Sequence, residues 1–207
     1  MIYEFIKNNY ALDEPIFLTD FKSKNNESLR QEMKKLTDEG KLVRVYNGVY
    51  YQAYKTKLNT IGKLSIDKYI FKKYIIDDNK TIGYITGLSL ANKYGFTTQN
   101  PSVIEICSNN ASTKQRKYEV DGYNLIIYKP VDLINNDNLS ALQFLDLMAN
   151  IDKYSELEKE ELRSKLKEFV NKTNVNFDIV KKYINLYPDR IYKNIYEGGL
   201  MNELLWW

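Results

Sequence analysis

The stretch that decides the fold runs from Pro15 to Tyr51 and reads PIFLTDFKSKNNESLRQEMKKLTDEGKLVRVYNGVYY. Its middle part places Leu29, Met33 and Leu36 at positions i, i+4 and i+7. This spacing forms one apolar stripe on an α-helix, because 3.6 residues make a turn. The stretch therefore predicts a helix over residues 27–39 that packs one face against a core.

The residues after this helix predict a β-hairpin. Gly40 follows as a helix stop, and apolar and polar residues then alternate on both sides of Asn47-Gly48. Asn-Gly is the favoured pair for a two-residue type I′ turn, so strands are expected at residues 42–46 and 49–51. A short approach helix, a second helix and a hairpin, in this order, are typical of a winged helix-turn-helix, a module that usually docks on duplex DNA.

The rest of the chain predicts a second, mixed domain. The fold class is therefore α+β: an N-terminal winged helix-turn-helix over 1–55, then a domain over 60–207 with a small sheet and a helical tail from about 153. The elements expected outside the opening stretch are helices at 2–9, 61–76 and 81–94, strands at 103–107, 118–120 and 125–128, helices at 138–148, 155–171 and 176–187, and a last helical stretch that reaches residue 207.

Composition places the chain among ordinary globular proteins. Of its 207 residues 43% are hydrophobic and 28% charged. No run approaches the roughly 20 apolar residues of a membrane helix, so no membrane partner is expected. Cys107 is the only cysteine and no secretion signal is recognisable at the N-terminus, so a cytoplasmic location is expected.

The complete absence of histidine narrows the chemistry. Ser-His-Asp and Cys-His catalysis are excluded, and a Cys/His zinc site cannot be built from one cysteine. We therefore expect a protein that is not an enzyme, with no catalytic residues, no metal site and no cofactor. Carboxylates remain available for Mg²⁺ chemistry, so a nuclease or transferase stays a minor alternative, although no paired acidic motif follows a recognisable strand.

Charge is distributed unevenly along the chain. Residues 1–75 hold 14 Lys and Arg against 9 Asp and Glu, whereas residues 76–207 hold 16 against 18. A mildly basic head suits weak attraction to phosphate. Since the excess is small, each head is expected to bind DNA modestly and to gain from forming a homodimer on DNA.

The outward face of the 27–39 helix supplies the candidate DNA contacts. A hydroxyl, an amide able to pair with adenine, and two ammonium groups project from it, at Ser28, Gln31, Lys34 and Lys35. On the wing, Arg44 and Tyr46 are candidates for phosphate or minor-groove contact. Asn47 and Gly48 are better explained by turn chemistry. The alternative for the whole head is a solvated surface that binds another protein without DNA.

The chain also resembles a known family in its middle part. The hairpin is followed by Gly83-Tyr-Ile-Thr-Gly-Leu-Ser-Leu-Ala-Asn-Lys-Tyr-Gly-Phe-Thr-Thr-Gln-Asn-Pro101 and then by Glu105-Ile-Cys-Ser-Asn-Asn. This order resembles the AbiEi-like antitoxins and transcriptional regulators of bacterial abortive-infection systems. The likeness spans roughly residues 15–150, and the segment from Gly83 to Pro101 is its most specific part.

The resemblance implies a function in phage defence. It implies a type IV antitoxin of a toxin–antitoxin system: a repressor that binds inverted repeats in its own promoter and counteracts a nucleotidyltransferase-like toxin without requiring a stable complex. The family's DNA-binding residues are basic and polar positions of the winged helix. Here these correspond to Lys22, Lys24, Gln31, Lys34, Lys35 and Arg44.

Overall fold

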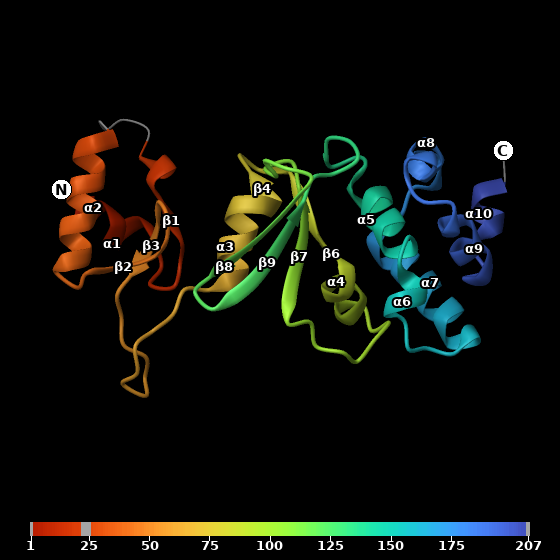
Figure 1. Cartoon of the computed structure of the whole chain (residues 1–207), viewed down its shortest axis with the longest axis horizontal. Coiled ribbons are helices and arrows are strands. Elements are labelled where there is room, and N and C mark those ends of the chain that lie inside the picture. The colour runs from red at the N-terminus through yellow and green to blue at the C-terminus, as the bar shows by residue number, and fades with distance from the viewer. Residues whose placement is uncertain (1, 22–25, 206–207) are drawn as a thin grey trace. The chain divides into compact units, whose positions relative to one another are not determined.

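The computed structural model describes residues 2–21 and 26–205 as a mixed α+β protein with small sheets and C-terminal helices. The chain divides into two compact units. The first takes the chain up to Lys73 together with Glu119–Tyr123, and the second takes Tyr74–Tyr118 and the chain from Asn124 onward. Figure 1 labels the elements of both units.

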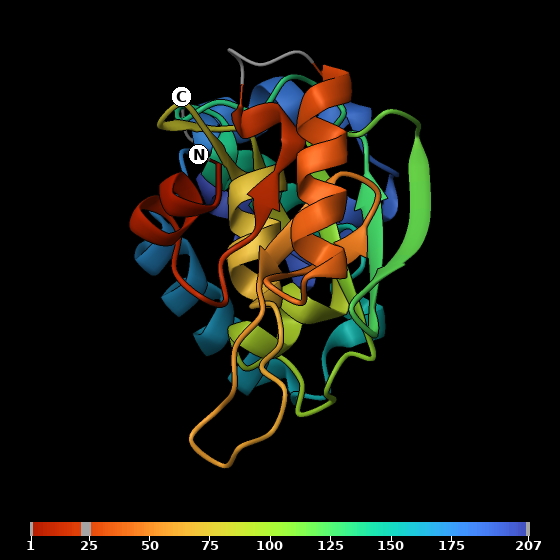
Figure 2. The ribbon, with the colours of Figure 1, turned by 90° about the vertical axis from the view of Figure 1, so that its left-hand side faces the viewer.

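The first unit is built on the opening stretch. Its elements are α1 (Ile2–Asn9), β1 (Ile16–Phe17), the 3₁₀ turn η1 (Leu18–Asp20), α2 (Asn26–Asp38), β2 (Leu42–Tyr46), β3 (Val49–Gln52), α3 (Ile66–Ile70) and the start of the π-helical turn η2 (Phe71–Ile75). The strands form an antiparallel sheet in the order β1-β3-β2. Figure 2 shows α2 alongside this hairpin. The expected helices at 2–9 and 27–39 and both strands of the hairpin are confirmed.

The core of this unit follows the predicted apolar stripe. Leu29, Met33 and Leu36 are buried against α1 and β2 residues, and Met33 is completely enclosed. Because burial of a large apolar side chain contributes about 1.5–3 kcal/mol, this stripe holds α2 on the unit more firmly than its helix propensity does. Gly40 adopts a φ of 68° just after α2, as expected for a helix stop.

The hairpin turn differs from the prediction. A type I′ turn requires positive φ at both central residues, but only Gly48 has it (φ 74°), and Asn47 does not. The strand register shifts between Arg44 and Tyr46, which marks a bulge. Arg44 donates from Nη2 to Asn47 Oδ1 at 3.0 Å, and this side-chain bond accompanies the altered turn.

The helix expected at 61–76 begins later, at Ile66. Ser65 caps it, because its Oγ accepts the Lys68 N–H at 3.3 Å. Lys68 Nζ lies 2.6 Å from Asp13 Oδ1, and Lys72 Nζ lies 3.1 Å from Asp20 Oδ2. These ion pairs, one from α3 and one from the start of η2, and the burial of Tyr69 attach this segment to the first unit.

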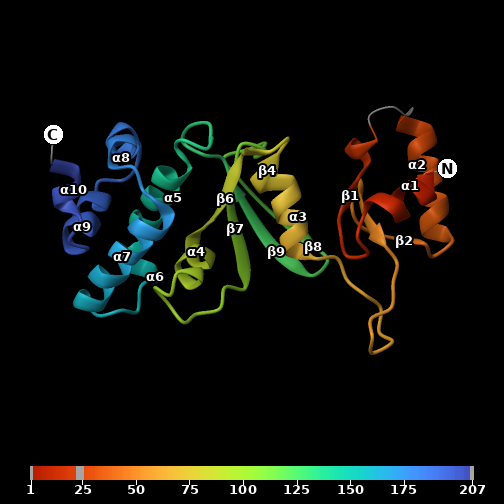
Figure 3. The same ribbon diagram turned by 180° about the vertical axis from the view of Figure 1, so that it is seen from behind.

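The second unit combines a four-stranded sheet with helices. Its elements are β4 (Ile76–Asp77), β5 (Lys80–Thr81), β6 (Gly83–Thr86), α4 (Gly87–Lys93), β7 (Val103–Ser108), β8 (Gln115–Val120), β9 (Tyr123–Tyr128), α5 (Leu139–Met148), α6 (Ile151–Tyr154), α7 (Lys159–Thr173), α8 (Phe177–Tyr183), η3 (Ile184–Leu186), α9 (Arg190–Glu197) and α10 (Met201–Leu205). The sheet order is β6-β7-β9-β8, with β6 antiparallel and β9 parallel to β7. Figure 3 shows α5 to α10 gathered on one side of this sheet.

The single helix expected at 81–94 is wrong in its first half, where residues 83–86 form β6. This strand pairs with β7, and its backbone at Gly83 packs against two carbonyl groups: an added Cβ would lie 2.1 Å from Tyr74 O and 2.7 Å from Cys107 O. Only glycine fits so close an approach. One of the two carbonyl groups belongs to η2 and the other to the neighbouring strand β7.

The remaining elements of the second unit agree with the sequence reading in kind. The strands at 103–107 and 125–128 are confirmed, and the β8–β9 turn at Asp121-Gly122 has positive φ at both residues. The helix at 138–148 is confirmed as α5. The tail is divided among several short helices, and α7 begins at Lys159 rather than at 155. No helix in the described residues is long and apolar enough to cross a membrane.

Candidate functional site

The predicted DNA-contact residues of α2 lie on its outward face. Ser28, Gln31, Lys34 and Lys35 are all exposed. With 100° between successive residues, Lys34 lies on the flank toward residues 30 and 37, whereas Ser28 and Lys35 lie on the opposite flank. The predicted face is therefore split into two flanks with different neighbours.

One flank of α2 and the hairpin enclose a groove of about 400 Å³. Three cationic side chains line it, Arg30 and Lys34 from α2 and Arg44 from β2, together with the carboxylate of Asp38. Leu18, Thr37, Asn47 and Tyr50 complete the lining. The groove brings together two of the predicted residues, Lys34 and Arg44. Its lining contains more positive than negative side chains.

Arg30 was missed by the sequence reading. At 100° per residue it lies between the buried stripe and the outer face, so it was assigned to neither. The signal was its position four residues before Lys34, since residues four apart are neighbours on a helix surface.

The other predicted contacts lie outside this groove. Lys35 Nζ lies 3.9 Å from Glu39 Oε1, so the Glu39 carboxylate balances part of the positive charge of Lys35. The same carboxylate also pairs with Lys41 Nζ at 2.7 Å. Tyr46 is half-buried at the end of β2, and Lys73 Nζ lies 5.5 Å from its ring centre. Lys22 and Lys24 lie outside the described residues.

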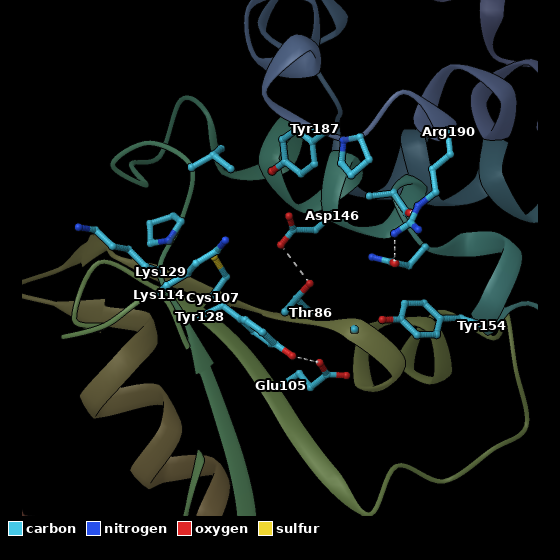
Figure 4. A pocket seen from close by; sticks show the side chains of 16 residues that line it. Thr86, Glu105, Cys107, Lys114, Tyr128, Lys129, Asp146, Tyr154, Tyr187 and Arg190 are labelled. Carbon is cyan, nitrogen blue, oxygen red and sulfur yellow. Dashed lines mark hydrogen bonds between the residues drawn. The ribbon is translucent and has the colours of Figure 1, made fainter. Parts of the chain in front are cut away.

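The second unit contains a larger pocket of about 500 Å³. Its walls come from the sheet, from the segment after β9, and from α5, α6 and the start of α9 (Figure 4). Strand register places the polar residues of the sheet on one side, because Tyr84 pairs with Cys107 and Thr86 with Glu105. The alternate residues, such as Ile106 and Ile127, are buried on the other side.

Asp146 faces this polar side of the sheet from α5. Its Oδ2 accepts hydrogen bonds from the Tyr84 hydroxyl at 2.9 Å and from Thr86 Oγ1 at 3.1 Å. Burial of the carboxylate raises the pKa of Asp146, against the hydrogen bonds from Tyr84, Tyr187 and Thr86, which lower it. The charged form of Asp146 is therefore costly in this structure.

Glu105 is the second carboxylate of the pocket. Its Oε2 accepts from the Tyr128 hydroxyl at 2.8 Å, and its Oε1 accepts from the Leu88 N–H at 3.3 Å. Gly87 makes room for it: the residue has a φ of 63°, and an added Cβ would lie 2.1 Å from Glu105 Oε1. Glycine is thus required here both by conformation and by space.

Basic residues stand around the same pocket. Lys114, Lys129 and Arg190 line it, and all three are exposed. Arg190 donates from Nε to Ala149 O at 2.5 Å and from Nη2 to Asn150 Oδ1 at 2.6 Å. The backbone of the two lysines is joined by a hydrogen bond from Lys129 N–H to Lys114 O at 3.1 Å.

Burial keeps the thiol and the tyrosine hydroxyls of the pocket neutral. It raises the pKa of the Cys107 thiol to about 12 and that of the Tyr154 hydroxyl to about 12. It also raises the pKa of Tyr128 and Tyr187 above their usual range. A protonated, buried thiol is a poor nucleophile, so Cys107 has the environment of a structural cysteine.

The sequence reading did not identify this pocket, although a signal was present. Asp146 is a single charge in a helix whose other residues are nearly all apolar, and it lies four residues after Leu142, on the buried side. Across residues 2–21 and 26–205, no three His, Cys, Asp or Glu side chains cluster as metal ligands. No protein-family model matches the chain, and no curated protein shows significant similarity to it.

Proposed function

We propose that this protein is a DNA-binding transcriptional autoregulator with antitoxin activity, whose first unit is a winged helix-turn-helix. The groove between α2 and the hairpin carries this proposal, because Arg30, Lys34 and Arg44 line it together. A helix for the major groove and a hairpin for the adjacent backbone are the two reading elements of this module. The antiparallel pairing of β2 with β3, next to β1 in the order β1-β3-β2, supports the assignment of this hairpin as the wing.

The three cations serve as phosphate contacts in this proposal, and Gln31 is the candidate for base recognition. Arg and Lys position a protein on the duplex, whereas an amide on the helix can pair with adenine. The groove also contains Asp38, and Glu39 balances Lys35, so the local field is weak. Two heads on an inverted repeat would add their contacts, which is why we propose a homodimer on DNA.

The test is a gel-shift titration with the protein's own upstream region against random DNA of the same length. We expect preferential binding, weakened by Gln31→Ala with Lys34→Ala. The dependence of the binding constant on salt separates the roles of Lys34 and Gln31. Loss of the Lys34 phosphate contact should lower the slope of log K against log salt concentration by about 0.9, whereas loss of the Gln31 base contact should reduce the preference for the protein's own upstream DNA over random DNA. Binding no better than to random DNA at low salt would refute the proposal.

The antitoxin part of the proposal rests on the resemblance of Gly83–Pro101 and the following strand to AbiEi-like proteins. The partner is a nucleotidyltransferase-like toxin that is counteracted without a stable complex. Co-expression with such a toxin from the neighbouring reading frame should restore growth. Continued growth arrest, with both proteins present, would remove the antitoxin role and leave the regulator.

The alternative is a winged-helix adaptor that binds a protein and no DNA. The balanced charges around Glu39 favour this alternative, because they dilute the field of a DNA-binding surface. Salt-insensitive capture of a neighbour-encoded protein, together with the absence of a DNA shift, would select the adaptor.

A further inference from the structure

The pocket of the second unit has a feature that a structural core does not require. The side of the sheet that faces α5 is mixed: Tyr84 and Cys107 pack in an apolar cluster with Leu142, but Thr86, Glu105 and the Tyr128 hydroxyl also lie on it, while the opposite side carries buried residues such as Ile106 and Ile127. A sheet covered by helices normally presents apolar residues to them. The polar groups on this side therefore mark a place where the fold departs from simple apolar packing.

Asp146 carries the energetic cost of this departure, because burial of its carboxylate raises its pKa, and Glu105 is a second, half-buried carboxylate of the same pocket. Asp146 and Glu105 receive hydrogen bonds from neutral hydroxyl and amide groups. Among the described residues, no ion pair involves either carboxylate. Buried charges in proteins are normally paired, and leaving one unpaired is strongly unfavourable. Lys114, Lys129 and Arg190 line the same pocket without forming an ion pair with these two carboxylates, so both carboxylates are available to a cationic group of a ligand.

The walls suit an organic cation. Tyr128, Tyr154 and Tyr187 line the pocket, and their hydroxyls stay protonated. Aromatic rings attract cations through their faces. The volume of about 500 Å³ lies within the usual range of small-molecule sites. Figure 4 shows Lys114 and Lys129 together on one side of the two carboxylates and Arg190 with Tyr154 on the other.

We propose that this pocket binds a small organic cation that also carries an acidic group, as a basic amino acid does. Its ammonium or guanidinium group binds Asp146 and Glu105, and its acid binds Lys114 and Lys129. Arg190 is already bonded to Ala149 and Asn150, so it shapes the wall. Thr86, Gly87, Glu105 and Cys107 come from the segments that carry the family resemblance, and DNA binding plays no part in the proposal.

The test uses the full chain and four probes: L-arginine, L-lysine, agmatine and L-citrulline. Agmatine lacks the acid of arginine, and citrulline is a neutral molecule of similar size. We expect arginine or lysine to raise the melting temperature and release heat on titration, agmatine to bind more weakly, and citrulline to bind weakest. Citrulline binding as well as arginine, or no response to either cationic amino acid at millimolar concentration, would overturn the proposal.

Variants assign the two ends of the ligand. Asp146→Asn keeps the shape of the side chain and should weaken binding of the cationic probes about tenfold or more, as expected for a lost charge-assisted hydrogen bond. Lys129→Ala, at an exposed position, should weaken arginine binding and leave agmatine unchanged. Asp137→Asn, exposed and outside the pocket, is the matched control. Equal loss for agmatine in Lys129→Ala would contradict the acid-binding role of the lysines.

Discussion

Two helices, α2 of the first unit and α5 of the second, place their charges in opposite ways. On α2 the apolar residues point inward and Gln31, Lys34 and Lys35 point to solvent. On α5 nearly every residue is apolar and buried, and the one charged residue, Asp146, points inward to a polar sheet face. Charges on α2 stay hydrated and cost little, whereas Asp146 is retained at a cost in stability. The hydrated charges of α2 are accessible to a large partner such as the proposed DNA. Asp146 lines a pocket, where a small ligand can reach it.

The largest expected effect compares two glycines with the same backbone conformation. Gly40 and Gly87 have φ of 68° and 63°, but a Cβ on Gly40 meets nothing within 4 Å, whereas on Gly87 it meets Glu105 Oε1 at 2.1 Å. Gly40→Ala should lower the free energy of unfolding by about 1–2 kcal/mol, because alanine pays only the cost of the left-handed backbone conformation at this position. Gly87→Ala should destabilise by roughly 3 kcal/mol or more, because the steric clash adds to it.

Urea unfolding of both variants measures this difference. Equal losses of unfolding free energy would mean that Glu105 moves away without cost, and the close packing of the pocket against Gly87 would then be unimportant. Gly122→Ala, which also has positive φ and open space around it, controls for the conformational effect.

The second prediction separates the two flanks of α2. Arg30→Ala should lower the salt slope of DNA binding by about 0.9, because one phosphate contact is lost. Lys35→Ala should change it less, since Glu39 partly balances Lys35 at 3.9 Å. Gel shifts at several salt concentrations measure both slopes. A larger effect from Lys35 would place DNA on the opposite flank of the helix and away from the groove.

The third prediction concerns the pH dependence caused by Asp146. Its pKa is raised in the folded state, so the folded protein holds a proton that the unfolded chain releases above about pH 4. Stability from this group is therefore present at low pH and lost as pH rises through the folded pKa. The pKa values of the facing Tyr84, Tyr187 and Cys107 are raised as well, to about 12 for Cys107, so these groups stay protonated at neutral pH.

Asp146→Asn should consequently be more stable than the natural chain at neutral pH, and the gain should shrink toward pH 4. Melting temperatures across this range test it, with Asp137→Asn as the control. A variant that is less stable at neutral pH would show that the carboxylate stabilises the fold, and the contrast with α2 would then fail.

The smallest expected effect is at Glu156, a surface carboxylate with the opposite shift. The Thr98 N–H at 2.9 Å, the Gln99 amide and the Thr98 hydroxyl lower the pKa of Glu156 to about 2. Stability from this group is present above its ordinary pKa of about 4.5 and lost as pH falls toward about 2. Glu156→Gln should reduce the loss of stability between about pH 4.5 and about pH 2 and leave the stability at higher pH with the same pH dependence. The reduction should be small, because solvent screens the group. A change confined to neutral pH would contradict the assignment.

Local sequence patterns were sufficient wherever one face of an element was apolar and the other polar. The helix 27–39 and the hairpin strands followed from spacing alone, because the residues that define each element are near one another in the chain. The strand at 83–86 did not, since small residues with helical spacing also fit a strand that packs against a carbonyl of Tyr74. That contact is distant in sequence, and no local pattern contains it.

The sequence by itself determined the α+β class, the basic character of the first 75 residues, the exclusion of histidine chemistry and the outward position of Gln31 and Lys34. Tertiary structure alone decided that Arg30 and Arg44 line the same groove and that Asp146 and Glu105 line the same pocket. The physical reason is that helix and strand periods are properties of neighbouring residues, whereas the meeting of two charges depends on strand register and helix packing.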